Sequence, residues 1–307
     1  FQRAGWGYFF LGSAAVMPRP DLNEELDDSQ LTGTVKLAYH PNDNTLTYAS
    51  FATGYKAGGT NTDRILPSLS PLFDAEKSRS AEIGIKHDFE EYGVRVNAAA
   101  HYTQISDFQA TTFTGTGFNL QNAGDIIVKG IELEATWLMT ESTELHAVAS
   151  RTLANFDEFK RGTCWVAYTW HTGIDDPGRV EPNDPFCSRD GDRVGFEPQN
   201  SLSLMLNHYF EVGNYPASAS IDYQYTGDVF LDDANDPYKY ADDFSLFNVR
   251  VSFTIPQWDS EIIAWSRNVF DEEYVARSGF DVPVQTGKIM AYPGAPRSFG
   301  VTFRKSF

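Results

Sequence analysis

The chain has 307 residues, of which 41% are hydrophobic and 14% aromatic, which excludes a disordered protein and allows one large all-β domain or two smaller ones. The formal net charge of -18 excludes the basic face that nucleic-acid binding requires, so no nucleic-acid partner is expected. No run of about 18 apolar residues is present, which excludes a transmembrane helix but not transmembrane strands of about 9 to 11 residues. The chain begins FQRAGWGYFF, with neither a methionine nor a secretion signal, and is interpreted as a processed or partial chain.

Period-two segments recur along the whole chain, and no convincing amphipathic helix interrupts them. This pattern predicts eleven strands, with a twelfth in the N-terminal segment near 4–12. In chain order the eleven lie near residues 31–40, 44–54, 78–89, 92–106, 125–139, 143–155, 199–211, 216–227, 244–256, 260–270 and 297–307.

The connections between these strands alternate between short and long. The short ones are HPNDN, FEEYG, MTEST, EVGNYP and PQWDS, and the long ones lie near 55–77, 107–124, 156–198, 228–243 and 271–296. A soluble sandwich has no reason to keep this alternation, because both of its ends face the same water. An outer-membrane barrel does, because its periplasmic turns are tight and its extracellular loops are long.

The strands also have one apolar and one polar face, as the stretch FSLFNVRVSFTI at 244–255 shows. Asn248 and Arg250 are expected to face the lumen or a plug. Accordingly, Val251→Arg is predicted to block assembly, whereas Ser252→Arg is predicted to be tolerated. Four residues of the apolar parity are expected to face lipid: Phe247, Val249, Val251 and Phe253.

Two cysteines, Cys164 and Cys187, lie in one polar, loop-like region. In an oxidising compartment they would form a disulfide that closes a loop of roughly two dozen residues. Two unpaired thiols are the alternative.

Six segments, in order, resemble the C-terminal half of a TonB-dependent outer-membrane receptor. They are YASFATGYKAGGTN (48–61), EIGIKHDF with VNAAAHY (82–102), NAGDIIVKGIELEATW (122–137), GDRVGFEPQNSL (191–202), AWSRNVFDEEYV (264–275) and YPGAPRSFGVTFRKSF (292–307). The terminal Phe307 resembles the assembly signal of outer-membrane barrels. The resemblance implies an all-β fold, a transmembrane antiparallel β-barrel of 22 strands, of which this chain supplies about 11 or 12 and no plug domain.

A half-barrel leaves two open edges in lipid, so the remainder of the barrel must come from the same polypeptide or from another chain. A complete 12-stranded barrel is the alternative. The resemblance further implies the outer membrane of a Gram-negative bacterium, with outer-membrane lipid and the TonB–ExbB–ExbD energy-coupling complex as partners.

The function implied by the resemblance is energy-coupled uptake of a scarce, bulky ligand, most commonly a ferric siderophore and otherwise cobalamin, haem or a glycan. A passive outer-membrane porin and a soluble all-β carbohydrate-binding protein are the alternatives. No enzyme is expected, because the sequence contains no G-x-S-x-G, H-E-x-x-H or Walker motif.

Candidate ligand-binding residues lie in the long connections. Lys56 in GYKAGG offers a positive charge at one rim position. The alternative for the aromatic residues is that they fold their own loops. The aromatic and imidazole candidates, whose rings suit sugar faces or catecholate groups, are Trp165, Tyr168, Trp170, His171, Tyr238 and Tyr240.

No cofactor is expected apart from a calcium ion in the extracellular loops. Asp190 and Asp192 in CSRDGDRVG are the candidate ligands, because calcium prefers carboxylate oxygens. Their spacing is not that of an EF-hand, and a solvated acidic loop is the alternative.

Overall fold

The structure is a computed structural model that describes residues 23–61, 70–113, 118–165, 175–181, 186–281 and 288–306. The predicted strand near 4–12 and the candidate residues Tyr168, Trp170, His171 and Phe307 lie outside these residues. Within the described part of the chain, no helix combines the length and the apolar character needed to cross a membrane.

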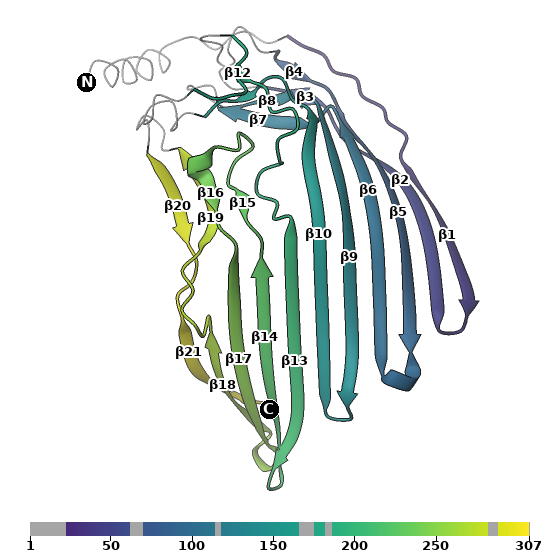
Figure 1. Cartoon of the computed structure of the whole chain (residues 1–307), viewed down its shortest axis with the longest axis vertical. Helices are drawn as coiled ribbons and strands as arrows, with labels where there is room; N and C mark the ends of the chain where they lie inside the picture. The colour runs from purple at the N-terminus through teal and green to yellow at the C-terminus, as the bar shows by residue number, and fades with distance from the viewer. Residues whose placement is uncertain are drawn as a thin grey trace.

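Eleven long strands form one antiparallel sheet in which each strand pairs with the long strand that follows it in the chain. Figure 1 shows them as a single curved wall. Each overlaps one predicted strand, so the all-β prediction is confirmed. The strands are β1 (Gly33–Asn42), β2 (Thr45–Lys56), β5 (Glu76–Phe89), β6 (Val94–Ser106), β9 (Asp125–Thr140), β10 (Thr143–Glu158), β13 (Asn200–Val212), β14 (Tyr215–Thr226), β17 (Phe244–Ile255), β18 (Ser260–Arg267) and β21 (Ser298–Lys305).

The short connections all lie at one end of the wall, called here the turn end (Figure 1). Two of them contain a single 3₁₀ turn, η1 (Glu90–Tyr92) and η3 (Pro256–Trp258). Each 3₁₀ turn closes on a residue with left-handed backbone, Gly93 at φ 61° and Asp259 at φ 45°. Glycine and aspartate are among the residues that adopt this conformation most readily, which is why these turns can be so tight.

The long connections lie at the opposite end, called here the loop end, where they fold into small two-stranded ribbons (Figure 1). Loops were predicted here. Most of these ribbon strands have only two residues, which is too short for a periodic pattern to reveal them in the sequence. One further 3₁₀ turn, η2 (Pro237–Lys239), precedes β16. The ribbons are β3–β4 (Gly59–Thr60, Leu72–Phe73), β7–β8 (Gln109–Phe113, Phe118–Asn122), β11–β12 (Gly162–Thr163, Phe186–Cys187), β15–β16 (Val229–Phe230, Tyr240–Ala241) and β19–β20 (Val275–Asp281, Ile289–Pro293).

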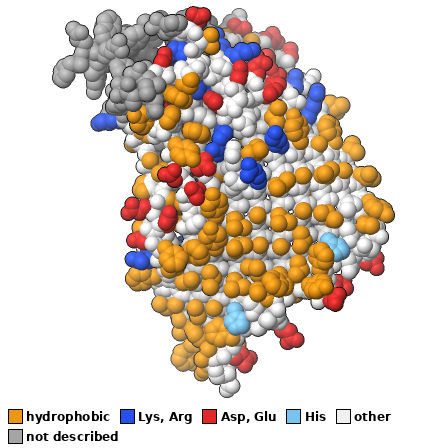
Figure 2. Space-filling view, in the orientation of Figure 1, with side chains coloured by type: hydrophobic (Ala, Val, Ile, Leu, Met, Phe, Trp, Pro, Cys, Tyr) orange, Lys and Arg blue, Asp and Glu red, His pale blue; other side chains and the backbone are white. Residues whose placement is uncertain are grey.

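The register places apolar side chains of neighbouring strands in rows on one face of the wall. Ile83 pairs with Ala100, and Ala100 pairs with Ile131 on the next strand. Figure 2 shows such hydrophobic rows crossing the strands. The four residues of β17 that were predicted to face lipid share this face, since they pair with Tyr223, Ile221, Ala219 and Ala217 of β14. We call it the apolar face.

Ser252 lies on the opposite face of β17, but it is not the open position that the predicted tolerance of Ser252→Arg requires. It is only 6% exposed, and its hydroxyl hydrogen-bonds that of Ser218 at 2.8 Å. Small residues allow close packing at this position. An arginine at 252 would therefore have no room, and Ser252→Arg is not the tolerated change that the sequence suggested.

A small hydrophobic core joins the wall to the ribbons at the loop end. The buried residues Ile126 of β9 and Phe156 of β10 pack with Ala110, Ala123 and Phe159 from the connections. The rings of Phe156 and Phe159 lie 4.9 Å apart. This core anchors the ribbon β7–β8 above β9 and β10.

Candidate functional site

The candidate site is the set of ribbons β3–β4, β7–β8, β11–β12 and β15–β16, called here the loop layer. A disulfide joins Cys164 to Cys187, the pair that the sequence led us to expect. The bond stands beside the ribbon β11–β12, in which Gly162 pairs with Cys187. Both cysteines are buried, so the bond cross-links the interior of the loop layer.

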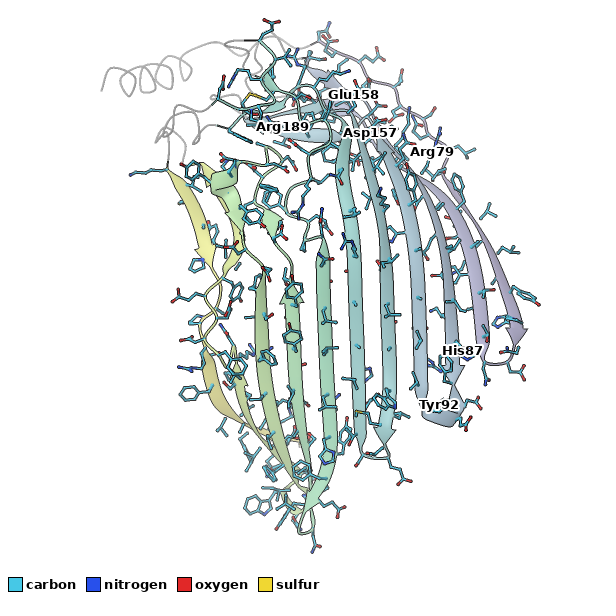
Figure 3. All side chains as sticks on the ribbon, viewed as in Figure 1. Arg79, His87, Tyr92, Asp157, Glu158 and Arg189 are labelled. Carbon is cyan, nitrogen blue, oxygen red and sulfur yellow. A yellow bond between two sulfur atoms is a disulfide. The ribbon has the colours of Figure 1, made fainter. Side chains whose placement is uncertain are left out.

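Arg189 lies at the centre of the loop layer with 2% of its surface exposed, and Figure 3 shows it at the loop end of the wall. Its guanidinium pairs with the carboxylate of Asp176, whose side chain is fully buried. It also donates to Asp192 Oδ2 at 3.2 Å and to the carbonyl of Ala234 at 2.6 Å. Because a buried charge must be paired, these contacts fix the positions of three chain segments at once.

Trp165 also joins two loops. Its indole Nε1–H donates to the carbonyl of Ala234 at 2.6 Å, and its backbone N–H donates to Asp176 at 2.8 Å. Trp165 was predicted to bind ligand, but its one indole donor is already used by the protein. These bonds show that Trp165 links the loops, and ligand binding by the faces of its ring stays a prediction.

The second loop, between β14 and β17, is held by further ion pairs. Arg193 donates to Asp228 Oδ2 at 2.6 Å, and Lys239 donates to Asp232 Oδ2 at 2.7 Å. Asp236 is fully buried and caps the start of η2 by accepting a hydrogen bond from the backbone N–H of Tyr238. The described parts of the 156–198 and 228–243 loops therefore pack together as one unit.

Asp190 and Asp192, the predicted calcium ligands, both have partners in the protein. Asp190 accepts the N–H of Phe159, and Asp192 pairs with Arg189. Burial raises the pKa of Asp192 even though Arg189 opposes the shift. In the described part of the chain, one group has metal-ligand spacing, Cys164, Asp176 and Cys187, and its two sulfurs are consumed by the disulfide.

Three of the predicted ligand residues present exposed side chains at the loop end of the wall. Tyr238 and Tyr240 are 47% and 42% exposed, and the Lys56 side chain is 59% exposed. The ring of Tyr240 packs edge-on against Phe230 at 5.2 Å. The Lys56 ammonium lies 4.0 Å from Glu76, a separation that leaves it free to contact a ligand as well. Of the predicted ligand residues that the structure describes, these three are the exposed ones.

Residues that the sequence analysis missed hold this layer in place. Gln109 is 5% exposed, and its amide donates to the carbonyls of Ala57 at 2.9 Å and Asp74 at 3.0 Å. Arg189, which pairs with Asp176, is the other. Nothing in their spacing distinguishes them from the many other polar residues of the long loops, because their partners lie far away in the sequence.

Lowering the pH is expected to change the stabilising contributions of two loop aspartates, Asp228 and Asp233, in opposite directions. The hydrogen bond from Arg193 holds the pKa of Asp228 below its usual range, so this stabilisation exists above the unfolded pKa of about 3.9 and is lost as the pH falls through the folded pKa. Burial raises the pKa of Asp233, so its neutral form is favoured below the unfolded pKa, and that contribution is lost as the pH rises through the folded value.

At neutral pH, Asp228→Asn is therefore expected to destabilise the loop layer by about 1 kcal/mol, a value reduced by solvent screening because both groups are partly exposed. Asp233→Asn is expected to stabilise it, since the amide oxygen still accepts the N–H of Gly195 without a buried charge. Protease protection of the loops, measured from neutral pH into acid, checks both. Changes of the same sign would contradict the assignment.

Known proteins with a similar sequence or structure have the same kind of β-sheet wall. The family model described as "TonB dependent receptor-like, beta-barrel" matches residues 12–269. The chain belongs to this family. The pesticin receptor of Yersinia pestis is 34% identical to it over 129 residues, which are 41% of this chain and 18% of that receptor. The chain thus spans less than a fifth of this curated relative.

Solved structures show the same barrel fold. The ferric yersiniabactin uptake receptor FyuA of Yersinia pestis aligns with a TM-score of 0.70 at 21% identity, over 91% of this chain and 38% of that one. The siderophore receptor PiuA of Acinetobacter baumannii gives 0.63 at 16% identity, over 89% and 35%. The copper transporter OprC gives 0.64 at 15% identity, over 90% and 39%. This TonB-dependent receptor barrel chain thus spans about two-fifths or less of each.

Proposed function

We propose that this barrel chain belongs to a receptor in the outer membrane of a Gram-negative bacterium that imports a ferric siderophore by energy-coupled uptake. The observation that supports the proposal best is the wall itself, with one apolar face along eleven strands and a cross-linked loop layer at one end. Such a face suits lipid, and such a layer suits the capture of a ligand before transport.

The two edge strands indicate what else the protein needs. Within the described part of the chain, β1 and β21 each pair with only one long strand. Unpaired backbone groups are costly in lipid, so further strands must complete the barrel. We propose that the TonB–ExbB–ExbD complex supplies the energy through the plug domain that the family resemblance implies.

The ligand class is proposed from the chemistry of the loop layer. The exposed rings of Tyr238 and Tyr240 suit flat catecholate or aromatic groups, and Lys56 suits the negative charge of a ferric chelate. PiuA is described as a siderophore receptor and FyuA as a ferric yersiniabactin uptake receptor, which supports the same class. Uptake of a metal without a siderophore is the second candidate, because a copper transporter has a similar fold.

The test compares the native strain with a deletion strain during uptake of radioactive iron supplied as ferric siderophores. Uptake is expected to require the gene and to stop when a protonophore collapses the proton gradient. The double change Tyr238→Ala with Tyr240→Ala is expected to weaken ligand binding about tenfold. The matched control is Tyr92→Ala, an exposed tyrosine at the turn end (Figure 3).

Uptake that persists in the deletion strain would contradict the proposed function. Uptake that needs the gene but ignores the protonophore would indicate a passive porin. Copper uptake in place of iron uptake would favour the second candidate.

Calcium binding by Asp190 and Asp192 remains a proposal. Both carboxylates retain an oxygen with which to contact an ion, although each already has a partner in the protein. Calorimetric titration of the purified receptor with calcium checks it, with Asp190→Asn as the variant that should lose binding.

A further inference from the structure

Two arginines lie on the face of the wall opposite to the apolar face, called here the inner face. Arg250 of β17 lies two residues from Ser252, so both are on this face. Arg250 pairs with Trp265 of β18, and Arg267 lies two residues beyond Trp265 on the same strand. Both arginines are exposed. We call Arg250, Trp265 and Arg267 the inner arginine cluster.

The indole of Trp265 has a fixed orientation within the cluster. It covers its partner on β21, Gly300, where a β-carbon would lie 2.6 Å from the ring. Its Nε1–H donates to Thr302 Oγ1 at 3.2 Å. The guanidinium carbon of Arg267 lies 5.3 Å from the ring centre, a distance at which a cation is attracted to an aromatic face. The ring therefore holds one arginine in place beside the other.

The described part of the chain supplies no close countercharge for the two arginines. Neither forms an ion pair within 4.0 Å with another described residue. Asp222 of β14 pairs with Asn248, two residues from Arg250, so this carboxylate is a diagonal neighbour about 7–8 Å away. Glu261, lower on β18, is already paired with Arg304 at 2.9 Å. The guanidinium donors of the cluster are therefore open to an anion.

Farther along the wall, the inner face has the opposite charge. The strands β10, β13 and β14 separate β9 from β17, which amounts to about 19 Å along the sheet (Figure 1). An anion inside the barrel would be repelled from β5 and β9 and attracted to β17 and β18. The inner-face carboxylates at mid-height of β5 and β9 are Glu82, Glu132 and Glu134, opposed by Lys86 alone at the even positions of 80–86 and 130–136.

The cluster lies below the loop end of the wall. Six residues separate Arg250 from Phe244 at the loop end of β17, which at about 3.4 Å per residue and a tilt of about 40° is a depth of about 16 Å. Arg267 is the last residue of β18. The next residue, Asn268, is buried, and its amide donates to the carbonyl of Glu272 at 2.9 Å. A ligand that leaves the loop layer along these strands would meet Arg267 first and Arg250 after it.

The chemistry of the cluster suits a ferric chelate that carries negative charge. Arginine makes charge-assisted hydrogen bonds to anionic oxygens, often with two parallel donors. Arg250 and Arg267 are diagonal neighbours about 7–8 Å apart, so both can contact one bulky anion. We infer that the inner arginine cluster is a transit site, which holds an anionic, oxygen-rich ferric chelate after it has left the loop layer. This inference rests on the proposed function and deepens it.

The test uses the complete receptor in the deletion strain and two radioactive probes, a trianionic ferric tris-catecholate and a neutral ferric tris-hydroxamate. Binding is measured in cells treated with a protonophore, and the initial uptake rate is measured in energised cells. The double change Arg250→Gln with Arg267→Gln is expected to slow uptake of the trianion about tenfold and to leave its binding unchanged. Arg250→Lys with Arg267→Lys is expected to retain most of the rate, because lysine keeps the charge.

A matched control removes an exposed cation from the acidic part of the inner face. Lys86→Gln is expected to leave uptake of both chelates unchanged. Heat-modifiable migration on gels verifies that each variant is folded. If the glutamine variant slowed both chelates equally, the arginines would serve the structure or the docking of a plug, and the transit site would be wrong. Weaker binding of the trianion in protonophore-treated cells would likewise place the arginines in the first binding site.

The uptake measurements also separate this inference from the proposed function. A native receptor that takes up neither chelate would contradict the proposed function, and this inference with it. A native receptor that takes up the trianion at a rate the glutamine variant equals would contradict the transit site alone. Uptake of the neutral chelate only would also overturn the transit site, because its charges would then have no anion to hold.

Discussion

Replacing Val251 with arginine is expected to block assembly of the receptor. Val251 lies on the apolar face of β17, where it pairs with Ala219 and with Ala264. An arginine near the middle of the lipid-facing band costs about 2–4 kcal/mol. The variant is made in the native gene product, and the folded fraction in outer membranes is measured by heat-modifiable migration. We expect the folded band to be lost.

The control for Val251 requires a position on the opposite face with room for a long side chain. Ser252 does not provide it, because it is buried against Ser218. Gln224 does, since it is exposed and pairs with Leu246 and Ser203 on the opposite face. Gln224→Arg is expected to assemble like the native protein. Equal loss of assembly in both variants would refute the assignment of the faces.

The largest local effect is expected from Asp176→Ala in the loop layer. This change leaves the guanidinium of Arg189 buried without its closest countercharge, although Asp192 still contacts it. Removing one partner of a buried ion pair typically costs about 3–5 kcal/mol. We expect the 156–198 loop to lose its protection from protease while the strands stay folded. Hydrogen exchange in the loop and in the strands measures the two separately.

Two further variants make this prediction specific. Glu158→Ala removes a carboxylate from an exposed pair with Lys160 at 2.6 Å, and it is expected to cost no more than about 1 kcal/mol. The double change Asp176→Leu with Arg189→Met removes both buried charges and is expected to recover most of the protection, because apolar side chains can fill the same space. If Asp176→Ala were as mild as Glu158→Ala, the central role of Arg189 would be wrong.

The strands could be predicted from the sequence because their signals are local. The segment predicted at 244–256 forms β17 at 244–255, and that at 78–89 forms β5 at 76–89. Alternation of apolar and polar residues is visible within one strand, and a short turn is visible within five residues. These signals do not depend on what the rest of the chain does.

The contacts within the candidate site could not be predicted from the sequence because they join residues that lie far apart in the chain. Trp165 reaches Ala234 across 69 residues, and Arg189 reaches the same carbonyl across 45. No spacing rule relates such pairs. The sequence therefore could not show that the indole N–H of Trp165 links two loops.

The sequence by itself determined that the chain builds an antiparallel wall with one apolar face, with tight turns at one end and long connections at the other. The tertiary structure alone decided which connections pack together, and that Ser252 is enclosed while Gln224 is open. The physical reason is that periodicity is set by the backbone of a single strand, whereas register and loop packing depend on partners that only the folded chain brings together.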